Sequence, residues 1–91
     1  MRAPSYSTQF ARDVKRLQKR RKDLGKLKTL IEILLAEQPP PAIYKDHPLK
    51  HNWAGYRDAH VEPDWVLIYT IIEGGVRFER TGTHEELFEK M

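Results

Sequence analysis

The 91-residue chain contains no cysteine, which excludes disulfide bonds and thiolate metal sites as sources of stability. No apolar run approaches the roughly 18 residues needed to span a membrane. The longest run, residues 66–72, has the length of a strand and includes Thr70. The N-terminal residues lack the apolar segment of a secretory signal, and no glycine-rich phosphate loop or serine-nucleophile motif occurs. These absences predict a cytoplasmic protein without membrane contact, in which residues 1–91 form a single small domain.

Positive charge is concentrated in the first half of the chain. Residues 1–46 contain 11 Lys or Arg against 5 Asp or Glu, whereas residues 47–91 contain 5 against 8. This asymmetry predicts a polyanionic partner, most simply RNA, for the first half. The densest basic cluster consists of Arg16, Lys19, Arg20, Arg21 and Lys22. An ordinary solvated helix face is the alternative interpretation of this cluster.

The first half also predicts a short strand near residues 5–6, followed by two helices. Ser7 is placed to cap the first helix, whose apolar side chains recur at helical spacing through Leu17. Asp23 is placed to cap a second helix over about residues 24–37. The prolines that follow end this helix because proline lacks an amide hydrogen. A single tight turn between the helices predicts an antiparallel hairpin.

The second half predicts three strands, over residues 55–61, 65–72 and 76–81. Short turns join them, so they should be antiparallel neighbours. Thr83 and Glu86 have the spacing of a capping box, which predicts a short final helix. The expected fold is therefore α+β, in the order β-α-α-β-β-β-α, with the N-terminal strand and helix hairpin packed on an antiparallel sheet.

Alternation along the strands separates a polar face of the sheet from a core face. It places Asp58 and His60 on the same face of the first of the three strands. In the last strand it places Phe78 and Arg80 on a common face. We expect one face of the sheet to be buried by the helices while the other keeps ionisable groups over a shallow groove.

All four histidines lie in the second half, and histidine exchanges a proton near neutral pH. His47, His60 and His84 supply the base and acid needed when an RNA 2′-hydroxyl attacks the neighbouring phosphate. Asp64 is placed to orient a histidine, and Arg80 to hold the phosphate. Two aromatic candidates for stacking on an unpaired base are Trp65 and Phe88. A structural or surface role is the alternative for each of these residues.

Metal binding is the rival chemistry. His47 and His51 stand four residues apart, as do His60 and Asp64, a spacing that places two ligands on one face of a helix. A proline interrupts each interval, so neither pair is expected on a helix. No metal site is therefore predicted.

Three segments carry a resemblance to a known family: residues 44–49 (Tyr-Lys-Asp-His-Pro-Leu), 56–65 (Tyr-Arg-Asp-Ala-His-Val-Glu-Pro-Asp-Trp) and 78–84 (Phe-Glu-Arg-Thr-Gly-Thr-His). Together they resemble the YafQ branch of the RelE/ParE toxin superfamily, and the similarity covers nearly the whole chain. The resemblance implies a RelE-like fold and a toxin of a type II toxin–antitoxin system. It further implies a ribosome-dependent mRNA interferase, which inhibits translation by cutting mRNA in the A site, with adenine-rich lysine codons preferred.

The resemblance also implies roles for individual residues. The catalytic set falls on His47, His60, Asp64 and His84, and RNA contacts fall on Trp65, Arg80 and Phe88. Val66 stands where many wider relatives have an arginine, which favours chemistry led by histidine. No metal or other cofactor is implied. The implied partners are the 70S ribosome, mRNA and a cognate antitoxin with a ribbon-helix-helix part and an acidic flexible tail.

One loop departs from the family pattern. After His-Pro-Leu the family usually has a glycine two residues on, whereas this chain has Lys50, His51 and Asn52. The departure bears chiefly on codon preference, and His51 inherits no role. Two other functions stay open: a ParE-like gyrase inhibitor, which the histidine set disfavours, and a nucleic-acid-binding module acting through the basic helix alone.

Overall fold

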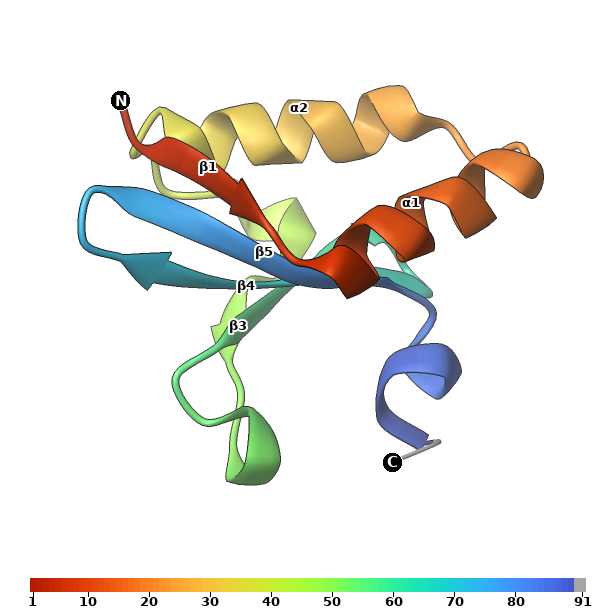
Figure 1. The fold of residues 1–91 in the computed structure, drawn as a ribbon. Helices are drawn as coiled ribbons and strands as arrows, with labels where there is room; N and C mark the ends of the chain where they lie inside the picture. Colours follow the sequence, from red (N-terminus) through yellow and green to blue (C-terminus); the bar gives the residue numbers. More distant parts are fainter. Residues whose placement is uncertain (90–91) are drawn as a thin grey trace.

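The computed structural model describes residues 1–89 and places two helices over one face of a five-stranded sheet (Figure 1). The elements are β1 (Ala3–Tyr6), α1 (Thr8–Lys19), α2 (Leu24–Leu35), η1 (Ala42–Tyr44), β2 (His47–Pro48), η2 (His51–Trp53), β3 (Arg57–Glu62), β4 (Trp65–Ile72), β5 (Gly75–Gly82) and η3 (Glu85–Glu89). This arrangement confirms the α+β class and adds the two-residue strand β2 to the predicted order. None of the helices in the described part is long and apolar enough to cross a bilayer.

Both long helices begin at the predicted caps. The Ser7 hydroxyl accepts a hydrogen bond from the Phe10 amide at 2.9 Å, and the Asp23 carboxylate accepts one from the Gly25 amide at 3.0 Å. These bonds satisfy amide hydrogens that have no partner within the first helical turn. The two helices run antiparallel on the same side of the sheet, as predicted for a helical hairpin (Figure 1).

The sheet has the strand order β1-β5-β4-β3-β2. Strands β3, β4 and β5 pair antiparallel, as predicted, and β2 pairs antiparallel with β3. Strand β1 pairs parallel to β5, with Tyr6 opposite Phe78, so the N-terminal strand joins the predicted antiparallel sheet and makes it mixed. Because β1 and β5 are distant in the chain, no turn between them specifies their relative direction.

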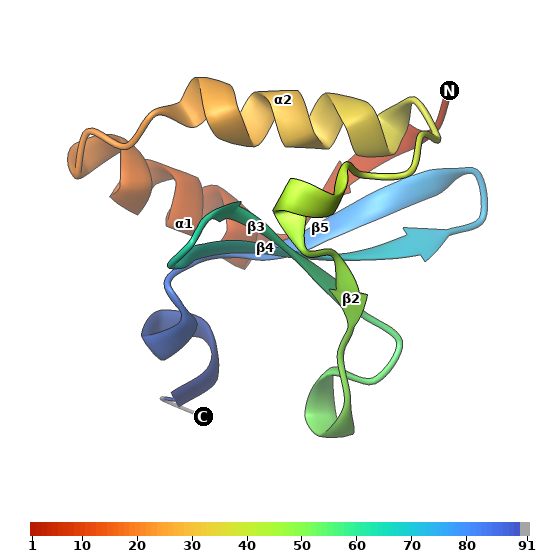
Figure 2. The same cartoon turned by 180° about the vertical axis from the view of Figure 1, so that it is seen from behind.

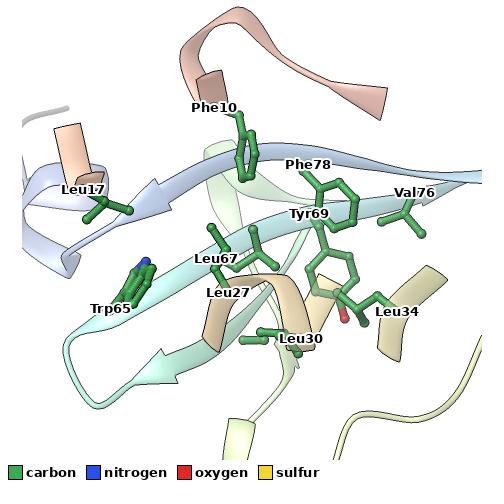
Figure 3. Packing of buried hydrophobic residues seen from close by; sticks show 11 residues of the cluster. Phe10, Leu17, Leu27, Leu30, Leu34, Trp65, Leu67, Tyr69, Val76 and Phe78 are labelled. Atoms are coloured by element: carbon green, nitrogen blue, oxygen red, sulfur yellow. The ribbon is translucent and has the colours of Figure 1, made fainter. Parts of the chain in front are cut away.

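The main core fills the space between the helices and the sheet (Figure 3). Its members bury nearly all of their side-chain surface and come from both helices and the three central strands: Phe10, Leu17, Leu27, Leu30, Leu34, Ala59, Trp65, Leu67, Tyr69, Val76 and Phe78. The burial of this apolar surface fixes which face of the sheet is left for function.

A second, smaller cluster covers the opposite face of the sheet. Val66 and Ile68 of β4 pack there with Leu87 of η3. Strand β4 is therefore buried on both faces, as its continuous apolar sequence predicts. The short elements η2 and η3 project from this face (Figures 1 and 2), and the candidate site lies on the same side.

Candidate active site

Three of the four histidines converge on the sheet face opposite the helices. His47 belongs to β2, His60 belongs to β3, and His84 immediately precedes η3. The ring centroids of His47 and His60 are 6.3 Å apart, and those of His60 and His84 are 5.2 Å apart. The structure thus brings together the three histidines predicted to act in catalysis, with His60 between the other two. His51 lies outside this cluster, on η2.

Asp58 was not among the predicted site residues, yet its carboxylate lies among the histidines. The residue is 2% exposed, and its Oδ1 lies 3.0 Å from His47 Nδ1. One carboxylate oxygen also lies within 4.8 Å of a ring nitrogen of His60 and of His84. Burial raises the pKa of Asp58, against the opposing attraction of His47, His60 and His84. Alternation along β3 placed Asp58 with His60, and this was the signal that could have identified it.

A backbone carbonyl determines which nitrogen of His47 carries the proton. Nδ1 lies 2.8 Å from the carbonyl oxygen of Lys45, and a carbonyl can only accept a hydrogen bond. Nδ1 therefore carries the hydrogen and donates a hydrogen bond to the Lys45 carbonyl. Its 3.0 Å contact with Asp58 Oδ1 is not a hydrogen bond, and it is an ion pair only when His47 is protonated. Neutral His47 is left with an unprotonated Nε2 that can accept a proton.

His84 is held by the predicted capping box. The Thr83 amide donates to Glu86 Oε1 at 3.0 Å, and the Glu86 amide donates to Thr83 Oγ1 at 3.2 Å. Asp64 Oδ1 lies 3.4 Å from His84 Nδ1, a long contact made by a side chain that is 76% exposed. The Phe88 ring centroid is 5.9 Å from that of His84. Asp64 and Phe88 therefore both adjoin the histidine cluster, as predicted.

A bulge in β5 changes the face on which Arg80 lies. Tyr69 pairs with Phe78 and Ile68 pairs with Arg80, so Glu79 is an extra residue in the ladder. Paired residues of antiparallel strands share a face, and Ile68 lies in the cluster on the histidine face. The expectation that Arg80 shares the face of Phe78 is therefore wrong.

Asp13 engages two of the five N–H donors of Arg80. The Nε and Nη2 atoms of Arg80 donate to Asp13 at 2.7 and 3.1 Å, and the Thr81 amide donates to the same carboxylate at 3.1 Å. Asp13 is 1% exposed and the Arg80 side chain is 21% exposed, so this largely buried ion pair fastens α1 to β5. Arg80 can therefore reach a phosphate through Nη1 and the second hydrogen of Nη2.

Trp65 is not exposed on the surface, as stacking on an RNA base would require. Its side chain is 1% exposed in the core beneath the helices, and its Nε1 donates to Thr81 Oγ1 at 2.8 Å. The prediction that Trp65 stacks on an RNA base is therefore wrong, because the side chain is buried and the Lys22 ammonium lies over its ring, 5.8 Å from the centroid. Trp53, which is not among the predicted site residues, lies beside Phe88, with ring centroids 6.4 Å apart.

The basic cluster of α1 is partly neutralised within the chain. Arg16 and Arg20 lie 2.8 and 2.9 Å from Glu86, and Lys22 lies 3.1 Å from Glu62. Among the side chains that the structure describes, Lys19 and Arg21 have no acidic partner. Of the five residues of the basic cluster, these two thus keep their charges for a partner.

The site also contains a set of groups that could hold a metal ion. One ligand atom from each of Asp58, His60 and His84 lies within 4.8 Å of the others. Imidazole and carboxylate ligands suit zinc and copper. This set differs from the two pairs considered from the sequence, since His51 and Asp64 do not belong to it.

Comparison with known proteins gives close matches in sequence and in structure. The family described as "Bacterial toxin of type II toxin-antitoxin system, YafQ" matches residues 2–89. The mRNA interferase toxin YafQ of Escherichia coli strain K12 is 60% identical over 84 residues, which cover 91% of each chain. A chain in the crystal structure of the E. coli DinJ–YafQ complex is similar at a TM-score of 0.90 and 58% identity, covering 97% of this chain and 99% of that one. A metal-bound toxin from Helicobacter pylori is similar at a TM-score of 0.91 and 38% identity, covering 97% and 100%.

Proposed function

Because the chain belongs to the YafQ family of type II toxin–antitoxin toxins, we propose that it is an endoribonuclease that cuts mRNA by histidine acid–base catalysis. The observation that carries this proposal is the convergence of His47, His60 and His84 around the buried Asp58. Cleavage of RNA by its own 2′-hydroxyl needs one group to accept a proton and another to donate one. Histidine performs both tasks near neutral pH.

His47 is the general base in this mechanism. Its Nδ1 is committed to the Lys45 carbonyl, so Nε2 takes the proton from the RNA 2′-hydroxyl. The 2′-oxygen then attacks the adjacent phosphorus. Negative charge builds on the phosphate oxygens, where His60, between the two outer histidines, is placed to stabilise it.

His84 is the general acid. Its Nδ1 contacts Asp64, which leaves the Nε2 proton for the leaving group. As the bond from phosphorus to the 5′-oxygen breaks, that proton passes to the oxygen. The products are a 2′,3′-cyclic phosphate and a free 5′-hydroxyl. The negative charge of Asp58 stabilises the positive charge that the histidines carry during the cycle.

The ribosome is the proposed site of action, with the mRNA codon presented in the A site and adenine-rich lysine codons as substrates. Lys19 at the end of α1 and Arg21 in the turn that follows support this, because their charges are available to ribosomal RNA. Action on translating ribosomes places the protein in the cytoplasm, with residues 1–91 acting as a single toxin domain; residues 90–91 lie outside the described part.

A cognate antitoxin is the proposed protein partner, with a ribbon-helix-helix part and an acidic, flexible tail. The E. coli relative forms a complex with DinJ. A cavity of about 630 Å³ beside His60 supports the binding of such a tail. Lys26 and Lys45 line it together with Ile43, which is 81% exposed. A tail that folds into this cavity would bury apolar side chains while its carboxylates meet Lys45, because Lys26 already pairs with Glu62 at 3.0 Å.

Two alternatives make different predictions. A gyrase inhibitor or a plain nucleic-acid-binding module would leave mRNA intact, and the histidine cluster would have no task. The test adds purified protein to ribosomes that translate a defined mRNA and maps the new RNA ends. We expect cleavage by the wild type and by the control Glu73→Gln, an exposed turn residue, but not by His84→Ala. Intact mRNA with folded wild-type protein would contradict the proposal and favour the alternatives.

A further inference from the structure

A second cavity, of about 390 Å³, lies between the loop that carries η2 and the C-terminal turn η3. Both elements project from the histidine face of the sheet (Figures 1 and 2). The residues that line the cavity are Leu49, Lys50, His51, Asn52, Trp53 and Phe88. Its volume lies within the roughly 300–1,000 Å³ that is typical of small-ligand sites.

The cavity adjoins the catalytic histidines through Phe88. The Phe88 ring lies 5.9 Å from the His84 ring on one side and 6.4 Å from the Trp53 ring on the other. A phosphate held between His47 and His84 therefore has its neighbouring nucleotide beside this cavity. The cavity thus lies where a nucleotide that flanks the cut must pass.

The lining has the chemistry of a nucleobase site. The Trp53 and Phe88 rings provide aromatic surface for a planar base, and the Asn52 amide can both donate to and accept from a base edge. Lys50 adds a positive charge for the phosphate, and none of the six lining residues is acidic. An anionic ligand with an aromatic ring therefore matches these groups.

Two further features of the loop have no explanation in the fold itself. Trp53 Nε1 is buried and has no hydrogen-bond partner among the residues that the structure describes. His51 adopts a left-handed backbone with φ of 57°, a conformation that side chains other than glycine rarely take. Such outliers concentrate at sites of ligand binding.

We infer that this cavity binds the base of the nucleotide next to the scissile phosphate, and that His51 and Asn52 select which base is accepted. Trp53 and Phe88 enclose the base. This inference rests on the proposed function, because it assigns the base preference of the same RNA cleavage.

The first test compares cleavage positions across mRNAs of mixed sequence on ribosomes, for the wild type, His51→Gly and Asn52→Ala. Glycine adopts the left-handed backbone of position 51 without strain, so His51→Gly should fold normally. We expect both variants to cut, with about a tenfold loss of base discrimination at one position beside the cut. Glu73→Gln, remote from the cavity, should keep the wild-type pattern. Unchanged base frequencies at every position in both variants would overturn the inference. A wild type that cuts no mRNA would instead overturn the proposed function.

The second test measures binding without cleavage. Short RNA oligonucleotides with 2′-deoxyribose at the cut position are titrated while tryptophan fluorescence is recorded. Trp65 is buried in the core, so Trp53 should report the bound base. We expect a saturable change in fluorescence that is lost in Trp53→Phe and needs about tenfold more oligonucleotide in Asn52→Ala. A response in Trp53→Phe equal to that of the wild type, or no response in the wild type, would contradict the inference.

Discussion

The negative charge of Asp58 assists the proposed catalysis but lowers the stability of the fold. Its carboxylate is buried, and burial raises its pKa because the charged form loses water. The replacement Asp58→Asn keeps the shape and removes the charge. We expect the free energy of unfolding to rise by about 1 kcal/mol at pH 7 while RNA cleavage slows by about tenfold or more. Urea denaturation and single-turnover cleavage measure the two effects.

Asp64→Asn is the matched control for this prediction. Asp64 is 76% exposed and contacts His84 at the long distance of 3.4 Å. Its replacement should change the free energy of unfolding by less than about 0.5 kcal/mol, as is usual for surface positions. A large loss of stability in Asp58→Asn would mean that the carboxylate is a net stabiliser of the fold, contrary to this account.

Single residues also show how far the sequence specifies the site. The motif segments located His47, His60 and His84, because polar residues at fixed places in strands and turns leave a clear pattern. Trp65 was misassigned because an aromatic residue at a strand start has the same local pattern whether it faces the core or RNA. Arg80 was placed on the wrong face because a bulge shifts the alternation of β5 by one residue.

At the scale of elements, Glu86 fastens η3, and with it His84, to α1. Burial opposes ionisation of Glu86, but hydrogen bonds from the Thr83 amide and Arg20, and the charges of Arg16 and Arg20, outweigh it and lower the pKa to about 2. In an unfolded chain the pKa is near 4.5. The ionised carboxylate therefore stabilises the fold above pH 4.5, and this contribution is lost as the pH falls toward 2.

The variant Glu86→Gln tests this contribution. We expect it to lower the free energy of unfolding by about 2 kcal/mol at pH 7, after allowance for solvent screening, and by much less near pH 2.5. Urea denaturation at the two pH values gives the comparison. An equal loss at both values would show that packing, and not the charge of Glu86, holds η3 in place.

Asp13 has the corresponding role for α1 and β5. Its carboxylate accepts hydrogen bonds from Arg80, Arg16 and the Thr81 amide, and it is 1% exposed. Removal of one member of a buried ion pair leaves the other without compensation, which costs about 3–5 kcal/mol. We expect Asp13→Ala to lower the free energy of unfolding by that amount in thermal or urea denaturation. A change of less than about 1 kcal/mol would contradict the anchoring role.

The elements differ in how well the sequence predicted them. Helices α1 and α2 and strands β3 to β5 follow caps, periodicity and turn residues, all of which are local signals. Strand β2 was missed because two residues, His47 and Pro48, are too short to show alternation. The parallel direction of β1 depends on its pairing with a strand near the other end of the chain, which no local pattern encodes.

At the scale of the whole molecule, the uneven charge should affect binding to the ribosome more than the cleavage step. Since three residues of the basic cluster pair with Glu86 and Glu62, Lys19 and Arg21 should carry the contacts to ribosomal RNA. We expect reversal of both to glutamate to weaken ribosome binding. The slope of log binding constant against log salt concentration should fall by the amount expected for the loss of about two phosphate contacts. Lys28→Glu, at an exposed position on α2, provides the matched change of net charge for each single reversal. Equal weakening by Lys28→Glu and by the single reversals would indicate general charge attraction without a defined surface.

The central claim for the molecule is that His84 donates the proton to the leaving 5′-oxygen. Its most direct test is RNA in which sulfur replaces that bridging oxygen, because a thiolate leaves without needing a proton. On ribosomes, His84→Ala should cut ordinary RNA at least about a hundredfold more slowly than the wild type. With the sulfur substrate, the variant should cut at close to the wild-type rate. A sulfur substrate that His84→Ala cuts as slowly as ordinary RNA would show that His84 is not the general acid.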